Sequence, residues 1–158
     1  MPLKLLTHSL WKQQVGILWW CLRKVPMLFW VKPKVLELTP QCCRLQVPLN
    51  WRTKNHVGSM YFGALLSAAD LVCGLLVLGV MEEQQLPCRL LFKEVHGKFL
   101  RRPEDKVEFC CVRNTSLEKT FLSLQSSGGK AFADLKVQAF SQGELVAEFE
   151  LEVALKRL

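Results

Sequence analysis

One long apolar stretch constrains the fold of this chain more than any other part of the sequence. Between residues 57 and 81 the only charged residue is Asp70. A helix that is apolar almost all round lies either in a protein core or within a membrane. The stretch begins with a turn at Gly58 and is then long enough for about six helical turns. The sequence therefore predicts one long, buried helix that ends near Glu82.

A narrow stripe of small and polar residues runs along this predicted helix. Its members follow the four, four, three, four spacing of one helical face: Ser59, Gly63, Ser67, Asp70 and Gly74. Leucine and valine residues cover the other faces. The stripe would let other backbone or a ligand come close while the remaining faces fill a core. A carboxylate held in such an apolar helix should have a raised pKa, as a general base requires.

Alternating patterns predict strands in much of the remaining chain. Apolar residues recur at every second position between residues 131 and 155, on both sides of the turn Ser141–Gln142–Gly143. Two such runs across a glycine-containing turn predict a β-hairpin with one face in water. Further strands are expected at residues 41–49, 89–100 and 106–113, and a short helix capped by Ser116 at residues 116–126.

This order of elements predicts an α+β fold. One apolar helix followed by antiparallel strands can bury all its faces if the sheet curls around it. The glycines within the stretch and an amphipathic sheet of matching size favour burial in protein. The alternative is a membrane span in which Asp70 is a polar functional residue.

The basic charge of the chain is confined to its N-terminal part. Residues 1–56 contain nine Lys and Arg residues, one acidic residue (Glu37) and all five tryptophans. The apolar run Val15–Leu22 is too short for a spanning helix or a signal peptide. It predicts a helix that packs onto the domain or a partner subunit, or one that lies on a membrane surface. No motif accompanies the charge that would indicate nucleic-acid binding.

We divide the chain into a basic, aromatic helical segment at residues 1–34 and one domain at residues 35–158. The seven cysteines include no CxxC spacing, so the sequence indicates neither a metal site nor a disulfide framework. A reduced, cytoplasmic setting is expected for such a chain.

Residues 55–70 resemble a known family. They are similar to the hotdog fold, and in particular to acyl-CoA thioesterases of the phenylacetic-acid-degradation type, whose motif runs Asn-x-x-Gly-x-x-His-Gly-Gly with a helical acid seven residues later. Four positions match: Asn55, Gly58, Gly63 and Asp70. Tyr61 and Phe62 replace the family's His-Gly pair. The stretch is still more similar to a branch described as a thioesterase-like domain of unknown function, and the likeness in layout covers about residues 30–158.

The resemblance implies a curved antiparallel sheet around one central helix, and roles for the matching residues. Asp70 would be base or nucleophile, the backbone N–H at Gly63 would face the thioester carbonyl, and Asn55 would orient a water or the thioester. The other substrate-binding candidates lie nearby: His56, Gly58, Ser59, Tyr61 and Ser67. Coenzyme A would be part of the substrate, and no separate cofactor or metal is implied.

Three functions remain open on this basis. The first is a homodimeric thioesterase for acyl-CoA or acyl-carrier protein, with the acyl site between one subunit's helix and the other's loops and with tetramers as a further option. The second is a non-catalytic hotdog module that binds an acyl chain or a protein partner, which the Tyr61–Phe62 replacement favours. The third is a membrane-associated protein held by peripheral contacts of residues 1–34.

Overall fold

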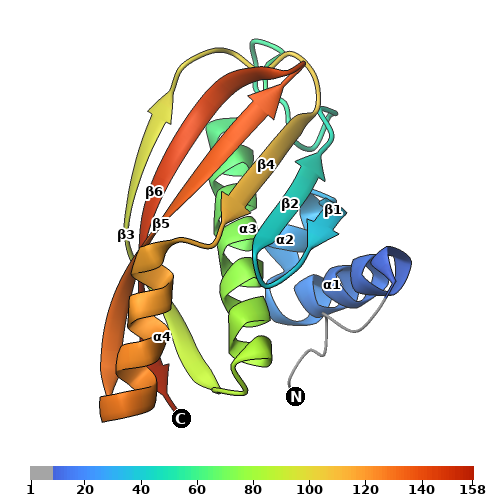
Figure 1. The fold of residues 1–158 in the computed structure, drawn as a ribbon. Coiled ribbons are helices and arrows are strands. Elements are labelled where there is room, and N and C mark those ends of the chain that lie inside the picture. The colour runs from blue at the N-terminus through green and yellow to red at the C-terminus, as the bar shows by residue number, and fades with distance from the viewer. Residues whose placement is uncertain (1–8) are drawn as a thin grey trace.

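The computed structural model describes residues 9–158 as one antiparallel sheet with helices packed against it (Figure 1). In chain order the elements are α1 (Leu10–Lys24), α2 (Pro26–Trp30), β1 (Lys34–Leu38), β2 (Cys42–Val47), α3 (Phe62–Glu83), β3 (Cys88–Phe99), β4 (Val107–Val112), α4 (Thr115–Ser127), β5 (Lys130–Ser141) and β6 (Glu144–Arg157). The six strands follow the order β1-β2-β4-β5-β6-β3. The predicted strands and the predicted hairpin are confirmed, whereas β1 was not anticipated.

The long apolar helix is the core of the molecule. The curved sheet wraps around α3, which packs on β2, β4 and β5 (Figure 1). Leu75, Leu76 and Val72 are at most 1% exposed. α3 is long and apolar enough to cross a membrane, but 72% of its most apolar window is buried inside this protein. The predicted α+β architecture, a curved antiparallel sheet around one central helix, is therefore confirmed.

The central helix begins at Phe62, later than the turn at Gly58 suggested. The preceding residues form a hydrogen-bonded loop, in which Lys54 and Met60 make an isolated bridge. Gly58 has a φ of 85°, which ends any helical path at that point. Ser59 therefore lies in the loop, and only the other four members of the predicted stripe belong to α3.

Within residues 9–158 no strand pairs with one side of the first half of β5, and α4 covers this free edge. Thr120 Oγ1 donates to the carbonyl of Phe132 at 2.5 Å, and Asn114 Nδ2 donates to that of Asp134 at 2.7 Å. The predicted cap was wrong by two residues. Asn114 Oδ1 accepts from the Leu117 N–H at 3.0 Å and caps the helix, while Ser116 Oγ accepts from the Asp134 N–H. These bonds pair backbone groups of β5 that would otherwise lie unpaired at an exposed edge of the sheet.

β3 is an edge of the sheet, and among the described strands it pairs only with β6. The register shifts between Phe92 and Glu94, so that Lys93 is an extra residue in the strand. Phe92 lies opposite Val153 and Val95 opposite Leu151, both of which are buried. Phe92, Val95 and Phe99 nevertheless remain 40%, 44% and 54% exposed. This edge of the sheet therefore presents an apolar surface to solvent.

The two N-terminal helices belong to the same core. Ile17, Cys21 and Leu28 are at most 3% exposed and join the central cluster of apolar side chains. The amide of Gln14 links α1 to the start of β1, because it donates to the Pro33 carbonyl at 2.9 Å and accepts from the Val35 N–H at 2.6 Å. The division of the chain at residue 34 remains a prediction, and its first eight residues lie outside the described part.

Candidate functional site

One face of α3 is left partly open by the other described residues. Three members of the predicted stripe lie on it, whereas Ser67 is buried. The half-exposed residues of this face recur at helical spacing: Gly63, Leu66, Asp70, Gly74 and Leu78. At Gly74 the side chains of Leu90 and Phe92 come close, each within 3.9 Å of the position that a Cβ would take. Small residues therefore do let other parts of the chain approach the helix here, as the spacing predicted.

Asp70 is the ionisable group on this face. Burial among apolar side chains raises the pKa of its carboxyl above the ordinary value. Among residues 9–158, none donates a hydrogen bond to the carboxylate or pairs with it. A half-buried carboxylate without a fixed partner, with a raised pKa, is suited to take a proton from water or to attack a carbonyl carbon.

Two pockets meet at Asp70. One, of about 280 Å³, is lined by Leu66, Asp70, Phe92, Lys93, Glu94, Val95 and Leu151. The other, of about 260 Å³, is lined by Trp20, Val25, Leu28, Asp70, Leu71, Gly74, Leu75, Leu78, Leu90 and Phe92. Asp70 and Phe92 line both. We call the second pocket the apolar slot, because Asp70 is the only charged side chain among the described residues of its lining.

Most of the other predicted site residues gather at the N-terminal end of α3. Asn55 fastens this loop, because its Oδ1 accepts from the N–H groups of Val57 and Ser59, both at 3.1 Å. Its Nδ2 donates to Ser59 Oγ at 3.1 Å. His56 and Gly58 are exposed in the same loop. The Asn55 amide is thus engaged within its own loop.

The first turn of α3 offers free hydrogen-bond donors. The N-cap residue, Tyr61, makes no side-chain cap bond, and within the described chain no acceptor meets the N–H of Phe62 or Gly63. Such donors, at the positive end of a helix dipole, favour a developing negative charge. The Tyr61 ring lies against Gly63 so closely that a Cβ there would clash with it. The Tyr61 ring therefore occupies the space in which a ligand is predicted to approach Gly63.

Asp70 and the loop are not in direct contact. Gly63 and Asp70 are seven residues apart on one helix, which corresponds to about 10 Å along its axis. Between them, Ser67 Oγ donates to the Gly63 carbonyl at 2.7 Å, so its hydroxyl is hydrogen-bonded to the backbone of its own helix. Sequence reasoning missed Trp20 and Phe92 as wall residues of the slot, because no local pattern links α1 and β3 to the middle of α3.

Cys73, one turn beyond Asp70, is not a nucleophile of this site. A hydrogen bond with Cys111, together with burial, raises the pKa of its thiol far above the ordinary value. Cys73 is fully buried, as are Cys43 and Cys111. A protonated thiol without solvent access does not attack a substrate.

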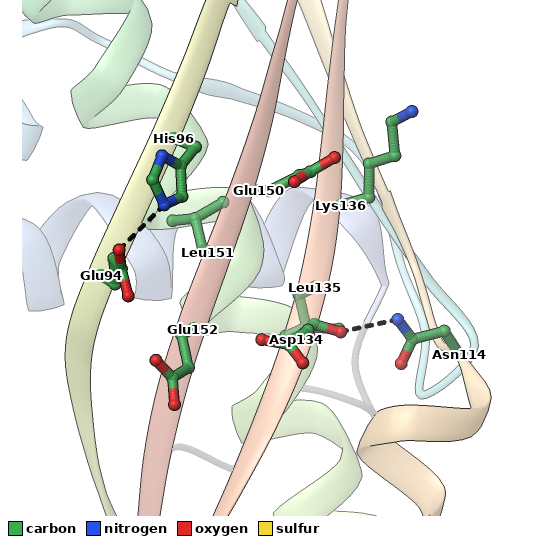
Figure 2. Close-up of a pocket in the computed structure, with 9 residues that line it drawn as sticks. All are labelled: Glu94, His96, Asn114, Asp134, Leu135, Lys136, Glu150, Leu151 and Glu152. Carbon is green, nitrogen blue, oxygen red and sulfur yellow. Dashed lines mark hydrogen bonds and ion pairs between the residues drawn. The ribbon is translucent and has the colours of Figure 1, made fainter.

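A further hollow lies on the opposite, polar face of the sheet. Figure 2 shows its lining, with acidic side chains from β3, β5 and β6 around a pocket of about 360 Å³. A hydrogen bond and a salt bridge engage two of these acidic side chains. His96 Nε2 lies 2.9 Å from Glu94, and Lys93 Nζ lies 2.9 Å from Glu152. Within residues 9–158 no group of side chains has the arrangement of a metal site. This hollow is a solvated charged surface.

Comparisons with known proteins agree with the architecture. A family model described as a domain of unknown function (DUF4442) matches residues 15–153. A search by sequence finds no match among curated proteins. Among solved structures, a protein of unknown function from Chlorobaculum tepidum superposes with a TM-score of 0.82 at 15% identity, over 95% of this chain and 98% of that one.

Two further solved structures are described as thioesterases. A protein of unknown function from Pseudomonas aeruginosa, described as a probable thioesterase, is 23% identical with a TM-score of 0.77, over 91% of this chain and 96% of that one. A thioesterase from Haemophilus influenzae is 13% identical with a TM-score of 0.72, over 99% of this chain and 96% of that one. At these identities the likeness shows the fold. The predicted hotdog fold is confirmed, and the family model supports the resemblance to a domain of unknown function.

The cost of burying Asp70 gives a test of its state. Because its pKa is raised in the folded protein, ionisation favours unfolding, and stability falls as the pH rises through the folded-state pKa. We expect Asp70→Asn to increase the free energy of unfolding at neutral pH by about 1 kcal/mol. The gain should vanish below the ordinary carboxyl pKa of about 4.

Urea unfolding at neutral and acidic pH measures this difference. Glu104→Gln, at an exposed carboxylate, is the matched control and should leave stability unchanged at both pH values. A loss of stability in Asp70→Asn at neutral pH would mean that the carboxylate accepts stabilising hydrogen bonds in the folded protein.

Proposed function

This chain belongs to the DUF4442 family and has the hotdog fold, and on that premise we propose that it is an acyl thioesterase acting on acyl-CoA or acyl-carrier protein. One observation carries the proposal. The carboxylate of Asp70, with its raised pKa, lies where an apolar slot meets a more open pocket. A thioester joins an apolar chain to a polar carrier, so its carbonyl belongs at such a junction.

The chemistry requires a proton acceptor and an oxyanion site. With Asp70 as base, the carboxylate takes a proton from water, and the hydroxide oxygen attacks the thioester carbonyl carbon. The C–S bond then breaks, the thiolate receives the proton, and a carboxylic acid and a free thiol are the products. With Asp70 as nucleophile, its carboxylate oxygen attacks the carbonyl carbon, the C–S bond breaks as the thiolate leaves, and a mixed anhydride forms. Water then cleaves the anhydride, which restores the carboxylate, releases the carboxylic acid and provides the proton for the thiolate. Both routes use the same residue.

The donor for the oxyanion comes from a second copy of the chain in this proposal. Gly63 and Asp70 lie about 10 Å apart along the axis of one helix, so the N–H of the first and the carboxylate of the second are poorly placed to act on one carbonyl carbon. A homodimer that brings the loop of one subunit to the Asp70 of the other would unite them. The Asn55 amide would hold that loop in place through its bonds to Val57 and Ser59.

The free edge of β3 supports such a dimer. The strand is twelve residues long, and its outer edge is unpaired within the described chain. Two copies can pair their β3 strands antiparallel across a two-fold axis. Pairing would also cover the exposed side chains of Val95 and Phe99 and of Phe62, whose ring lies 6.4 Å from that of Phe99.

The apolar slot is the proposed site of the acyl chain. Its far wall comes from the N-terminal helices, with Trp20 as its largest side chain. Trp20 is half-buried, whereas its neighbour Trp19 is 59% exposed. The length of acyl chain that fits would therefore depend on Trp20.

A non-catalytic acyl-binding module is the second candidate. The position of the Tyr61 ring against Gly63 favours it, because the ring occupies the space where a substrate carbonyl would approach the first turn of α3. Tyr61 is 49% exposed, so solvent lies on its other side and the ring has room to turn away. Catalysis requires that movement, and simple acyl binding in the slot does not.

Thiol release from a panel of short, medium and long acyl-CoAs tests the reaction. We expect turnover by the wild type and a loss of about 10²–10⁴-fold in kcat for Asp70→Asn, because the proton acceptor is gone. The wild-type kcat/KM should rise with pH through an apparent pKa above the ordinary carboxyl value of about 4. Absence of turnover with every substrate, while fatty acid still binds, would establish the acyl-binding module instead.

The same panel tests the slot. Trp20→Ala should raise kcat/KM for long chains relative to short ones by about tenfold or more, because the far wall is removed. Trp19→Ala is the matched control and should keep the wild-type profile. An unchanged profile in Trp20→Ala would place the acyl chain outside the slot, whatever the turnover.

Light scattering after size exclusion tests the dimer. The wild type should have the mass of two chains, whereas Val95→Glu should be monomeric because a charge at the strand edge opposes pairing. Leu122→Glu changes an equally apolar but 64% exposed residue on α4 and should leave the dimer intact. A dimer that persists in Val95→Glu would contradict pairing through β3.

A further inference from the structure

An exposed apolar stripe runs along the outer side of α1. Trp11, Val15, Trp19 and Leu22 follow the four, four, three spacing of one helical face, and they are 73%, 48%, 59% and 48% exposed. The buried face of the same helix contains Ile17 and Cys21. The folding of this chain therefore uses one side of α1 and leaves an apolar side, rich in tryptophan, in contact with water.

Positive charge borders this stripe. At 100° per residue, Lys12 and Arg23 lie along the edge next to Trp19, and both are exposed. The Arg23 guanidinium lies over the Trp19 ring, 4.3 Å from its centroid. Lys24 follows at the end of the helix. In the first 69 residues of the sequence the only acidic residue is Glu37, so nothing on α1 neutralises this charge.

We propose that this surface of α1 binds the protein peripherally to membranes that contain anionic lipids. A helix with tryptophans on one face and basic residues at its border matches the interface between acyl chains and headgroups. Anionic headgroups supply the complementary charge. α1 is well placed for this contact, because it packs mainly on α2 and β1 and projects from the side of the molecule (Figure 1).

The apolar slot links this surface to the rest of the protein. Trp20, Val25 and Leu28, which form its far wall, belong to α1, to α2 and to the link between them. A membrane-bound α1 would hold that wall close to the lipid surface. The proposal itself does not depend on thioesterase activity and would stand for an acyl-binding module as well.

Co-sedimentation of the full chain with vesicles tests the proposal. We expect the wild type to bind phosphatidylcholine vesicles that contain phosphatidylserine, with a shift of tryptophan emission to shorter wavelength, and to bind pure phosphatidylcholine more weakly. Binding should weaken with added salt, because the basic residues act through screened electrostatics. The double variants Trp11→Ser/Trp19→Ser and Lys12→Ser/Arg23→Ser should each weaken it by about tenfold or more.

A double variant on α4 provides the control. Lys119→Ser/Leu122→Ser removes one charge and one exposed apolar side chain from another helix, and it should bind as the wild type does. Urea unfolding should show that all four proteins are equally folded. The proposal is overturned if the wild type does not bind either vesicle, or if both α1 variants bind like the control. A third result would also overturn it, namely that the α1 stripe joins two copies of the protein. In that case Trp11→Ser/Trp19→Ser would have half the mass of the wild type, and the wild type would not bind vesicles.

Discussion

Burial of α3 is the constraint on which the rest of the structure depends. The helix is apolar almost all round, so every face must be covered, but one curved sheet reaches only part of it. The N-terminal helices cover a second part and contribute Ile17, Cys21 and Leu28 to the same core. What remains open is the narrow face with Gly63, Asp70 and Gly74. The candidate site is therefore the place where the covering of the core helix is left incomplete.

The position of Asp70 carries a cost that the rest of the core offsets. Its carboxyl lies among leucine and phenylalanine side chains, and its pKa is raised as a result. An uncharged polar residue of the same shape would destabilise the folded protein less at this position. Natural proteins keep such groups mainly where function requires them, which is why a local conflict between residue and environment is informative. The fold alone gives no reason for a carboxylate at this point of α3.

Local patterns were sufficient for most of the fold. The alternation in β5 and β6 and the apolar run of α3 each reflect a periodicity that burial imposes directly. Errors arose where a tertiary contact decided the outcome. Ser116 has the chemistry of a cap, but the free edge of β5 draws its hydroxyl to Asp134, and Asn114 caps the helix instead. The start of α3 was misplaced because the Asn55 loop, with its bridge to Met60, extends the irregular region.

The candidate site was predictable only in part, for a similar reason. Asp70 and Gly63 could be singled out because they interrupt an apolar helix and match a family pattern. The roles of the nearby residues, the dimer and the cytoplasmic setting remain predictions. Trp20 and Phe92 lie near Asp70 because α1, α3 and β3 pack together. The spacing of residues within a single helix or strand cannot predict such a contact. The Tyr61 ring over Gly63 likewise depends on how the loop folds.

The bulge in β3 has a consequence for how this strand tolerates changes in length. Phe92 and Val95 are three positions apart, so in a regular strand they would point to opposite faces. The extra residue, Lys93, lets both face inward, with Lys93 and Glu94 together opposite Glu152. Loss of one residue at this point would leave a regular strand with the same inward side chains, whereas loss of one residue between Val95 and Phe99 would turn Phe99 outward. Length variation among homologous chains should therefore be accepted at the bulge and excluded from the four residues after it.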